Sequence, residues 1–269
     1  MSFSIAGKTA VVTGAANGVG LSVARHFVQA GANVMFADMD EDSLVEEIGD
    51  NNNDDGSAAY FAGDLREKLN VANLLSATID RFDRVDILVN ASRQMLTSDP
   101  LNADDDGVIA LMNQNLMTSL RVTQVFAKRM IKQAKKEDDS DVPAGSIVNL
   151  SSIASHRAQP ELLAYSISSA AVDQMTRSMA VALAPYRIRV NAVSLGSVMS
   201  ASLKSQIKDN DELRGEIIDA TPLSRIAAPS ELADVAQFLA SDGSGFMTGQ
   251  ILTVDGGRSL LDAAEAPAH

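Results

Sequence analysis

Three glycines near the start of the chain have the spacing of a phosphate-binding turn. Gly14, Gly18 and Gly20 follow an apolar run that ends at Thr13, and a helical pattern of residues begins after them. This order predicts a strand, a tight turn and a helix N-terminus, whose free backbone N–H groups favour an anion. We expect Gly14 to let the chain turn, Gly18 to let the backbone approach a phosphate, and Gly20 to let the helix pack closely on the strand. The sequence therefore predicts binding of a dinucleotide pyrophosphate, the alternative being a turn with only a structural role.

A carboxylate that could bind the ribose of such a dinucleotide is Asp38. It ends the apolar run 33–38, about where a dinucleotide-binding unit places the acid that hydrogen-bonds the adenosine ribose hydroxyls. A carboxylate there would repel a 2′-phosphate, and neither Asn17 nor Met39 offers a cation to attract one. We therefore expect NAD to be preferred over NADP. The alternative is that Asp38 only opens the acidic run 40–42 and lies in solvent.

The elements that must position these residues alternate along the chain. Short apolar runs predict seven strands, at 8–13, 33–38, 58–62, 85–90, 145–151, 187–194 and 250–255. Helical spacing predicts helices after Gly20 and at about 66–83, 104–136, 164–184 and 229–240. This alternation predicts an α/β fold, a doubly wound parallel sheet flanked by helices, in a single domain over 1–262. Residues 197–222 interrupt the alternation and predict a substrate lid, and residues 263–269 predict a disordered tail.

The composition excludes several classes of function. The net charge of −13 over 269 residues argues against nucleic acid or an anionic membrane surface as a partner. There is no Cys, and no grouping of His, Asp and Glu has metal-ligand spacing, so we expect no catalytic metal. The N-terminus lacks a signal-peptide pattern and no apolar run reaches membrane-spanning length, so we expect a cytoplasmic protein. We interpret His156 as a solvated loop residue rather than a catalytic base.

Taken together, the motifs of this sequence resemble those of the short-chain dehydrogenase/reductase family over nearly the whole chain. They are Thr13-Gly14-x-x-x-Gly18-x-Gly20, Gly63-Asp64-Leu65, Asp86-Ile87-Leu88-Val89-Asn90, the run Gly145–Ser152, Thr248-Gly249-Gln250 and Val254-Asp255-Gly256-Gly257. The resemblance implies a Rossmann fold and reversible hydride transfer between NAD(H) and a secondary alcohol or ketone. It also implies a small-molecule substrate and a homotetramer or homodimer.

The resemblance assigns catalytic roles to three residues. It implies Tyr165 as general acid or base, Ser152 as the hydrogen-bond partner of the substrate oxygen, and Asn115 as the holder of a proton-relay water. The residue types fit, because a phenol can pass a proton and a neutral hydroxyl can stabilise developing alkoxide charge. Each taken alone has a structural alternative, as a helix-face aromatic, a strand-end cap and a helix kink respectively. The cofactor-binding residues that the resemblance implies are Gly14, Asn17, Gly18, Val19, Gly20, Asp38, Asp64, Leu65, Asn90, Tyr165, Gly196, Val198 and Ser200.

Several positions depart from the family pattern. The expected Tyr-x-x-x-Lys is Tyr165-Ser166-Ile167-Ser168-Ser169, so Ser169 stands at the lysine position. In the family this lysine binds the nicotinamide ribose and lowers the pKa of the tyrosine, which an uncharged serine cannot do. Arg93 replaces the glycine of Asn-Asn-Ala-Gly after the fourth strand, Gly196 follows a leucine instead of a proline, and Ser200 replaces a threonine near the nicotinamide carboxamide.

Two hypotheses follow from these departures. In the first, Arg93 supplies the missing positive charge and the protein is an active oxidoreductase, although a planar guanidinium needs a different geometry from an ammonium. In the second, Arg93 intrudes on the cofactor, catalysis is lost, and the fold serves as a nucleotide-binding, regulatory or scaffolding protein. An Arg93 side chain directed to solvent would contradict the first. The predicted lid offers apolar side chains and so favours a hydrophobic substrate. They are those of Met199, Leu203, Ile207, Leu213, Ile217 and Ile218. The alternative is that these side chains only pack against one another in a core of the lid itself.

Overall fold

Seven parallel strands form one sheet in the computed structural model, which describes residues 3–49, 56–137, 143–208 and 210–262. The strand order is β3-β2-β1-β4-β5-β6-β7. The strands are β1 (Thr9–Thr13), β2 (Asn33–Asp38), β3 (Ala58–Ala62), β4 (Ile87–Asn90), β5 (Gly145–Ser152), β6 (Ile188–Leu195) and β7 (Ile251–Val254). The predicted single-domain α/β fold is confirmed, with its sheet of seven parallel strands. The predicted tail at 263–269 lies outside the described residues.

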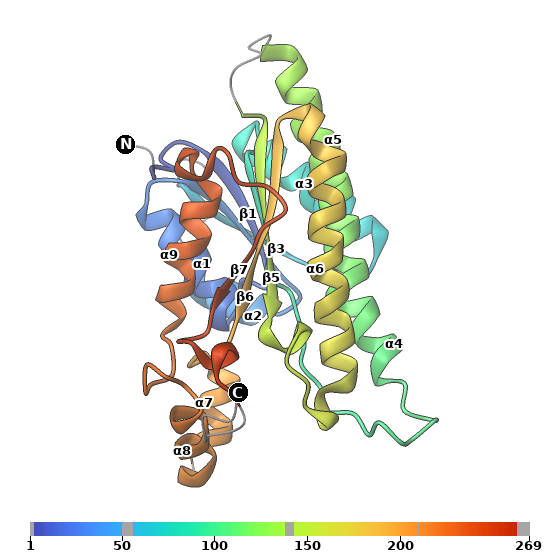
Figure 1. The fold of residues 1–269 in the computed structure, drawn as a ribbon. Coiled ribbons are helices and arrows are strands. Elements are labelled where there is room, and N and C mark those ends of the chain that lie inside the picture. Colours follow the sequence, from blue (N-terminus) through green and yellow to red (C-terminus); the bar gives the residue numbers. More distant parts are fainter. Residues whose placement is uncertain (1–2, 50–55, 138–142, 209, 263–269) are drawn as a thin grey trace.

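Helices cover both faces of this sheet (Figure 1). One face carries α1 (Gly18–Gln29), α2 (Glu41–Ile48) and α9 (Pro229–Ala240). The other carries α3 (Lys68–Phe82), α5 (Thr118–Glu137) and α6 (Leu163–Leu183). This arrangement explains why the strands are apolar without alternation, since each strand is covered on both sides.

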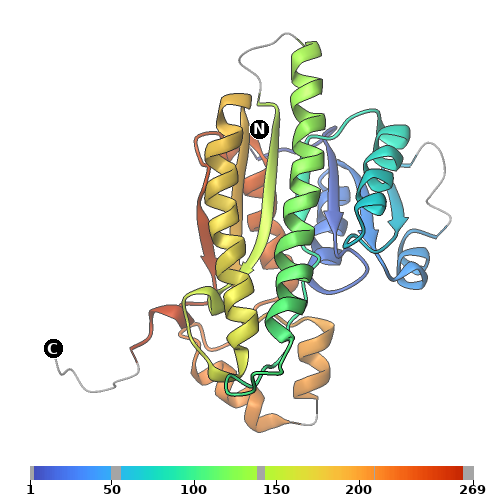
Figure 2. The same cartoon turned by 90° about the vertical axis from the view of Figure 1, so that its right-hand side faces the viewer.

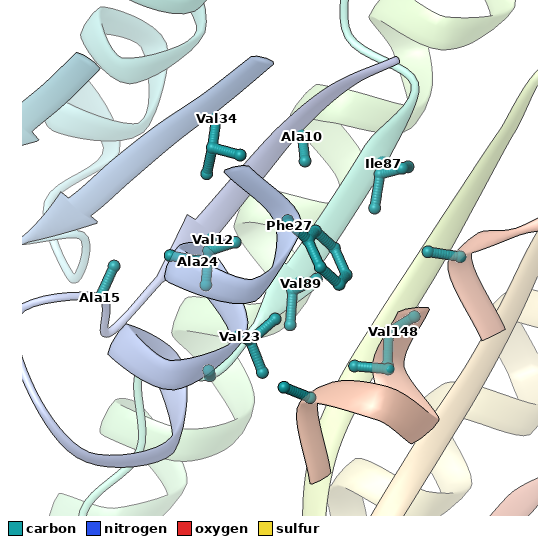
Figure 3. Packing of buried hydrophobic residues seen from close by; sticks show 14 of the residues in the cluster. Ala10, Val12, Ala15, Val23, Ala24, Phe27, Val34, Ile87, Val89 and Val148 are labelled. Atoms are coloured by element: carbon teal, nitrogen blue, oxygen red, sulfur yellow. The ribbon is translucent and has the colours of Figure 1, made fainter. Parts of the chain in front are cut away.

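The side chains of β1 divide between two hydrophobic cores. Ala10 and Val12 belong to the core beneath α1, whereas Val11 belongs to the core on the opposite face, and all three are fully buried. Figure 3 shows Val12 beside Val89 of the neighbouring strand and Phe27 of α1. Burial of a side chain such as Phe27 contributes about 1.5–3 kcal/mol to stability. The packing of α1 therefore fixes the position of the glycine turn that precedes it.

The helix predicted at 104–136 is not a regular α-helix. It begins as α4 (Gly107–Leu111), continues as a π-helical turn η2 (Met112–Met117) and only then becomes α5. Apolar periodicity cannot distinguish one wider turn inside a helix, and such turns often occur at functional sites.

The sequence analysis did not predict α2. Residues 40–42 stand out in the sequence only as an acidic run, but Asp40 caps the helix by accepting a hydrogen bond from the Ser43 N–H. An acidic residue at the N-cap and acids in the first turn are features that favour a helix start.

The segment predicted as a lid forms two short helices beyond the carboxyl ends of the strands (Figures 1 and 2). They are α7 (Ala201–Ile207) and α8 (Asp211–Asp219). A β-bridge between Val198 and Ala227 joins the two ends of this excursion. In the described part of the chain, no helix has the length and apolar character needed to cross a membrane.

Candidate active site

A cleft of about 1400 Å³ lies at the carboxyl ends of the strands, and most of the predicted site residues line it. These are Gly14, Asn17, Gly18, Val19, Gly20, Asp38, Asp64, Leu65, Arg93, Ser152, Tyr165, Gly196, Val198 and Ser200. Asn90, Asn115 and Ser169 do not line this cleft. They line a small cavity that also touches Arg93 and Tyr165.

The glycine turn after β1 has a geometry that larger residues could not adopt. Gly14 has a φ of +67°, and a Cβ there would lie 2.7 Å from the Ala91 carbonyl oxygen. A Cβ on Gly20 would lie 2.0 Å from the Gly14 carbonyl oxygen, so α1 starts directly against the turn. The side chain of Asn17, the N-cap of α1, makes no capping hydrogen bond. The turn and the helix start therefore offer backbone N–H groups to the cleft, which fits a dinucleotide pyrophosphate.

Asp38 lies at the end of β2 with its carboxylate held by backbone N–H groups. One oxygen accepts from Ala16 at 3.1 Å, and the other accepts from Met39 at 2.7 Å and Asp40 at 3.2 Å. These bonds fix a negative charge beside the glycine turn. That is the position from which a carboxylate can accept hydrogen bonds from a ribose.

Asp64, one of the residues that the resemblance implies as cofactor-binding, forms a bidentate ion pair with Arg66. Two nitrogens of the guanidinium donate to the carboxylate, the shortest bond being 2.7 Å. The hydrogen bonds from Arg66 hold the pKa of Asp64 below its ordinary value. The sequence analysis missed Arg66, because it searched for a cofactor-facing cation only at positions 17 and 39.

Arg93 is directed at Tyr165 and not into solvent. Its Nη1 donates to the Tyr165 hydroxyl at 2.5 Å and to the Ser151 carbonyl oxygen at 3.1 Å. The guanidinium carbon lies 5.8 Å from the centre of the tyrosine ring. Tyr165 itself is buried in the first turn of α6. This is the orientation that the first hypothesis requires, because it brings the positively charged guanidinium of Arg93 within hydrogen-bond distance of the phenol oxygen.

Ser169 occupies the lysine position one turn after Tyr165, and its side chain is buried. The small cavity beside it has a volume of about 10 Å³, close to the space that one water needs. The Oδ1 of Asn90 is buried and accepts no hydrogen bond from any described residue, whereas its Nδ2 donates to Thr123 and Asn149. A serine side chain and a small polar cavity therefore occupy the space that a lysine side chain would fill at this position.

Asn115 lies within the π-helical turn η2 and holds the segment that follows Arg93. Its Oδ1 accepts from the Gln94 N–H at 2.8 Å, and its Nδ2 donates to the Gln94 carbonyl oxygen at 2.9 Å. The same Nδ2 donates to the Ser168 hydroxyl at 3.1 Å, on the helix that carries Tyr165. Asn115 thus connects the Arg93 loop to α6. Its predicted role in holding a water stays a prediction.

The two serines at the cleft also act as caps. The Ser152 hydroxyl, at the end of β5, accepts from the Ala154 N–H at 3.2 Å, and that of Ser200 accepts from Leu203 at the start of α7. Each hydroxyl keeps its own proton to donate, because it serves only as an acceptor in its cap. The strand-end cap that was the structural alternative for Ser152 is therefore compatible with a catalytic role.

The other wall of the cleft is formed by the excursion after β6 and the turn after β7. Of the six apolar residues predicted in the lid, only three line the cleft: Leu203, Leu213 and Ile217. Gly196 lies close to that turn, since a Cβ on it would be 2.7 Å from the Cβ of Asp255. Within the described residues, the cations that line the cleft are all arginines: Arg66, Arg93, Arg157 and Arg258. The sequence analysis did not single out Arg157 or Arg258.

From the sequence we interpret His156 as a solvated loop residue. His156 is exposed, contacts the Ser155 hydroxyl through a ring nitrogen at 3.2 Å and does not line the cleft. In the part of the chain that the structure describes, no group of three or more His, Asp or Glu side chains could hold a metal ion.

The sequence pattern of the family described as enoyl-(acyl carrier protein) reductase matches residues 14–259. The chain is 32% identical to the 3-oxoacyl-(acyl-carrier-protein) reductase FabG of Thermotoga maritima, over 93% of this chain and 97% of that protein. It is 33% identical to the oxidoreductase UcpA of Escherichia coli O157:H7, over 95% of this chain and 96% of that protein. This chain belongs to the short-chain dehydrogenase/reductase family.

Solved structures of two dehydrogenases have the same fold. A gluconate 5-dehydrogenase from Burkholderia cenocepacia in complex with NADP and tartrate superposes with a TM-score of 0.86 at 28% identity, over 97% of this chain and 98% of that one. A 7α-hydroxysteroid dehydrogenase complexed with NADH and 7-oxo glycochenodeoxycholic acid gives 0.84 at 29% identity, over 95% and 96%. The family and the Rossmann fold implied by the sequence motifs are thus confirmed.

Proposed function

We propose that this short-chain dehydrogenase/reductase is an active NAD(H)-dependent oxidoreductase that interconverts a secondary alcohol and a ketone. The observation that carries the proposal is the hydrogen bond from Arg93 to the hydroxyl of Tyr165. It brings a guanidinium cation next to the phenol oxygen, although the position of the family lysine is occupied by Ser169. The contrary hypothesis of an inactive nucleotide-binding, regulatory or scaffolding protein rests on that serine and on an intrusion of Arg93 into the space of the cofactor.

Each residue of the cleft has its own role in the proposed reaction. The glycine turn and Asp38 would hold the dinucleotide, which supplies or accepts the hydride. The Ser152 hydroxyl donates a hydrogen bond to the substrate oxygen, and Tyr165 passes a proton to or from that oxygen. The guanidinium of Arg93 donates a hydrogen bond to the phenol oxygen and so stabilises the negative charge that develops there during proton transfer. A charge-assisted hydrogen bond of this kind contributes about 1.5–3 kcal/mol.

The preference for NAD over NADP rests on Asp38. The family does not decide the matter, since one of the two solved structures above holds NADP and the other NADH. Asp38 presents a fixed carboxylate that would repel a 2′-phosphate. The nearby cation of Arg66 is neutralised by Asp64 and is not free to attract one.

The remaining predictions belong to the same proposal. They are a substrate lid at 197–222 that closes over the cleft with Leu203, Leu213 and Ile217, a homodimer or homotetramer, and a location in the cytoplasm. The position of α7 and α8 beside the cleft supports the lid.

The first test is a direct titration of the purified protein with NADH and with NADPH, followed by nicotinamide fluorescence. We expect micromolar binding of NADH and much weaker binding of NADPH. Binding of neither cofactor would contradict the proposal and favour the inactive protein.

The second test separates compensation by Arg93 from decay of the site. We expect Arg93→Gln to lower kcat about 10- to 100-fold, since it removes a charge-assisted hydrogen bond. We expect Ser169→Lys to give no gain or a loss, because the phenol already has its cation. The matched control is Arg25→Gln, which removes an exposed arginine of α1 that pairs with Glu47 of α2. A large gain from Ser169→Lys with no effect of Arg93→Gln would show that the native site is crippled.

A further inference from the structure

We infer that the substrate carries an anionic group, a carboxylate or a phosphate, at the end of an apolar body, and that Arg157 and Arg258 bind this group. The inference rests on the proposed oxidoreductase function and names the substrate class of the same cleft. The observation behind it is that two arginines line the cleft far from the cofactor turn without forming an ion pair.

The sheet order separates these arginines from the residues predicted to bind the pyrophosphate and the adenosine ribose of the dinucleotide. Arg157 follows β5, and Arg258 follows β7, whereas the glycine turn follows β1 and Asp38 ends β2. In the order β3-β2-β1-β4-β5-β6-β7, β7 lies four strands from β1, or about 19 Å at 4.7–4.9 Å per strand. β5, which Arg157 follows, lies two strands from β1. Both arginines are therefore set apart from the glycine turn that would hold the cofactor phosphates, at the end of the cleft where the nicotinamide would meet the substrate.

Neither guanidinium is neutralised by the protein. Among the described residues, Arg157 makes no side-chain hydrogen bond or ion pair, and Arg258 makes one hydrogen bond, to the neutral Ser197 hydroxyl at 2.8 Å. The one carboxylate among the cleft residues on this side is Glu161, and it forms no ion pair with either arginine. In a chain with a net charge of −13, two unpaired arginines in one cleft attract an anion from solution.

Arg258 is held in place by the turn that carries it. The Asp255 carboxylate accepts hydrogen bonds from the N–H groups of Gly257 at 2.9 Å and Ser259 at 2.7 Å. Although partial burial opposes ionisation, hydrogen bonds from Ser259 and Gly257 hold the pKa of Asp255 below its ordinary range. Asp255 does not line the cleft. Its charge therefore fixes the turn from behind and leaves the guanidinium free for a ligand.

The apolar residues of the same wall define the rest of the substrate. Leu203 and Leu213 come from α7 and α8, Ile217 from α8, and Leu261 from the segment after Arg258. An apolar body packed on these side chains would leave its charged end at the arginine forks, whose planar donors match carboxylate or phosphate. The hydrophobic substrate predicted from the sequence thus gains an anionic end.

The test measures binding of ligands that cannot react. Straight-chain alkyl carboxylates of graded length, the alkyl phosphates and the neutral primary amides are titrated calorimetrically into the protein, with and without NADH. We expect one of the two anions to bind at least about tenfold more tightly than the amide of equal length. The tighter of the two identifies the group as a carboxylate or a phosphate.

Variants show where that preference comes from. We expect Arg157→Gln and Arg258→Gln each to reduce the anion-over-amide ratio severalfold, and Arg157→Lys to retain part of it. Arg25→Gln, which removes an arginine remote from the cleft, should leave the ratio unchanged. An amide that binds as well as both anions, no binding of any anion, or an unchanged ratio in both glutamine variants would overturn the inference.

The same panel distinguishes a failure of the inference from a failure of the proposed function. Ketone derivatives of the acids and amides are assayed by oxidation of NADH. A retained preference for anions without any turnover would contradict only the oxidoreductase. Turnover of amides and acids with equal kcat/KM would contradict only the anion site.

Discussion

The cation beside the hydroxyl of Tyr165 comes from a different part of the chain than the family pattern implies. The family lysine would come from the next turn of the same helix, whereas Arg93 comes from the loop after β4. Arginine is longer than lysine and keeps its charge in almost any environment. It can therefore act across the cleft, at the expense of the nicotinamide ribose contact that the lysine would have made.

We expect the cofactor preference to depend on a single carboxylate, that of Asp38. We expect Asp38→Ser to weaken NADH binding at least about tenfold and to bring the affinity for NADPH up to or above that for NADH, since the variant removes both the ribose acceptor and the repulsion of a 2′-phosphate. The measurement is the same fluorescence titration with both cofactors.

Asp42→Ser removes an exposed acid of α2 and serves as the control. An unchanged ratio of the two affinities in Asp38→Ser would show that another group selects the cofactor.

The sequence could predict the identity of most site residues but not their partners. Ser152, Asp38 and the glycines sit at strand ends, where a parallel sheet forces them to one edge. Arg93 sits in a loop, whose path no periodicity describes. Arg157 and Arg258 follow strand ends too, but nothing in one sequence shows that they are left unpaired. The role proposed for these two arginines depends on the absence of a carboxylate partner among the described residues, which only the folded structure can show.

Two helical segments position the site, and each depends on local detail. The π-helical turn η2 brings Asn115 to the Gln94 backbone, and α1 meets the glycine turn at Gly20. Strong periodicity and buried runs predicted most elements well, and 33–38, 58–62 and 229–240 match β2, β3 and α9 residue for residue. A helix kink was the structural alternative for Asn115, but the π-helical turn itself was not predicted, because apolar periodicity cannot distinguish one wider turn inside a helix.

Substitution of Gly20 tests how closely α1 packs on the turn. We expect Gly20→Ala to lower the free energy of unfolding by about 1–3 kcal/mol, because the new Cβ would overlap the Gly14 carbonyl oxygen and force α1 to shift. NADH affinity should fall with it. Both are measured on the same preparation, by thermal unfolding and by fluorescence titration.

Gly215→Ala is the matched control, since Gly215 lies inside α8 with no atom within 4 Å of the added Cβ. There we expect a gain of about 0.5–1 kcal/mol from helix propensity alone. Equal effects at the two positions would mean that the contact at Gly20 is not tight.

At the scale of the whole molecule, acid is expected to destabilise the fold. Hydrogen bonds from Arg225, together with the Ala228 N–H, lower the pKa of Glu231 from its ordinary value of 4.5 to about 2. The pKa values of Asp40, Asp64, Asp105 and Asp255 are lowered as well. A group whose pKa is lower in the folded state stabilises the fold above its unfolded pKa, and this contribution disappears as the pH falls through the folded pKa.

For Glu231, we expect Glu231→Gln to lower the midpoint of urea unfolding by a small and constant amount from pH 7 down to about 4.5. Below that pH the difference from the native protein should shrink, because the native carboxyl becomes protonated too. High salt should reduce the difference at neutral pH, since the pair with Arg225 is exposed.

Glu46→Gln, at an exposed position of α2, controls for the loss of one charge. A difference that stays constant below pH 4.5 would mean that the capping geometry at the start of α9, and not the charge, stabilises this helix.

The arginines of the cleft have a consequence for its reactivity. Among the described residues that line it there is no lysine, so a ketone or aldehyde held there meets no primary amine with which to condense to an imine. Amine-directed acylating reagents should leave the cleft untouched, whereas dicarbonyl reagents that attack guanidines should reach it. A reactive aldehyde or ketone with a single carbonyl group should therefore be turned over here without forming an imine with the protein.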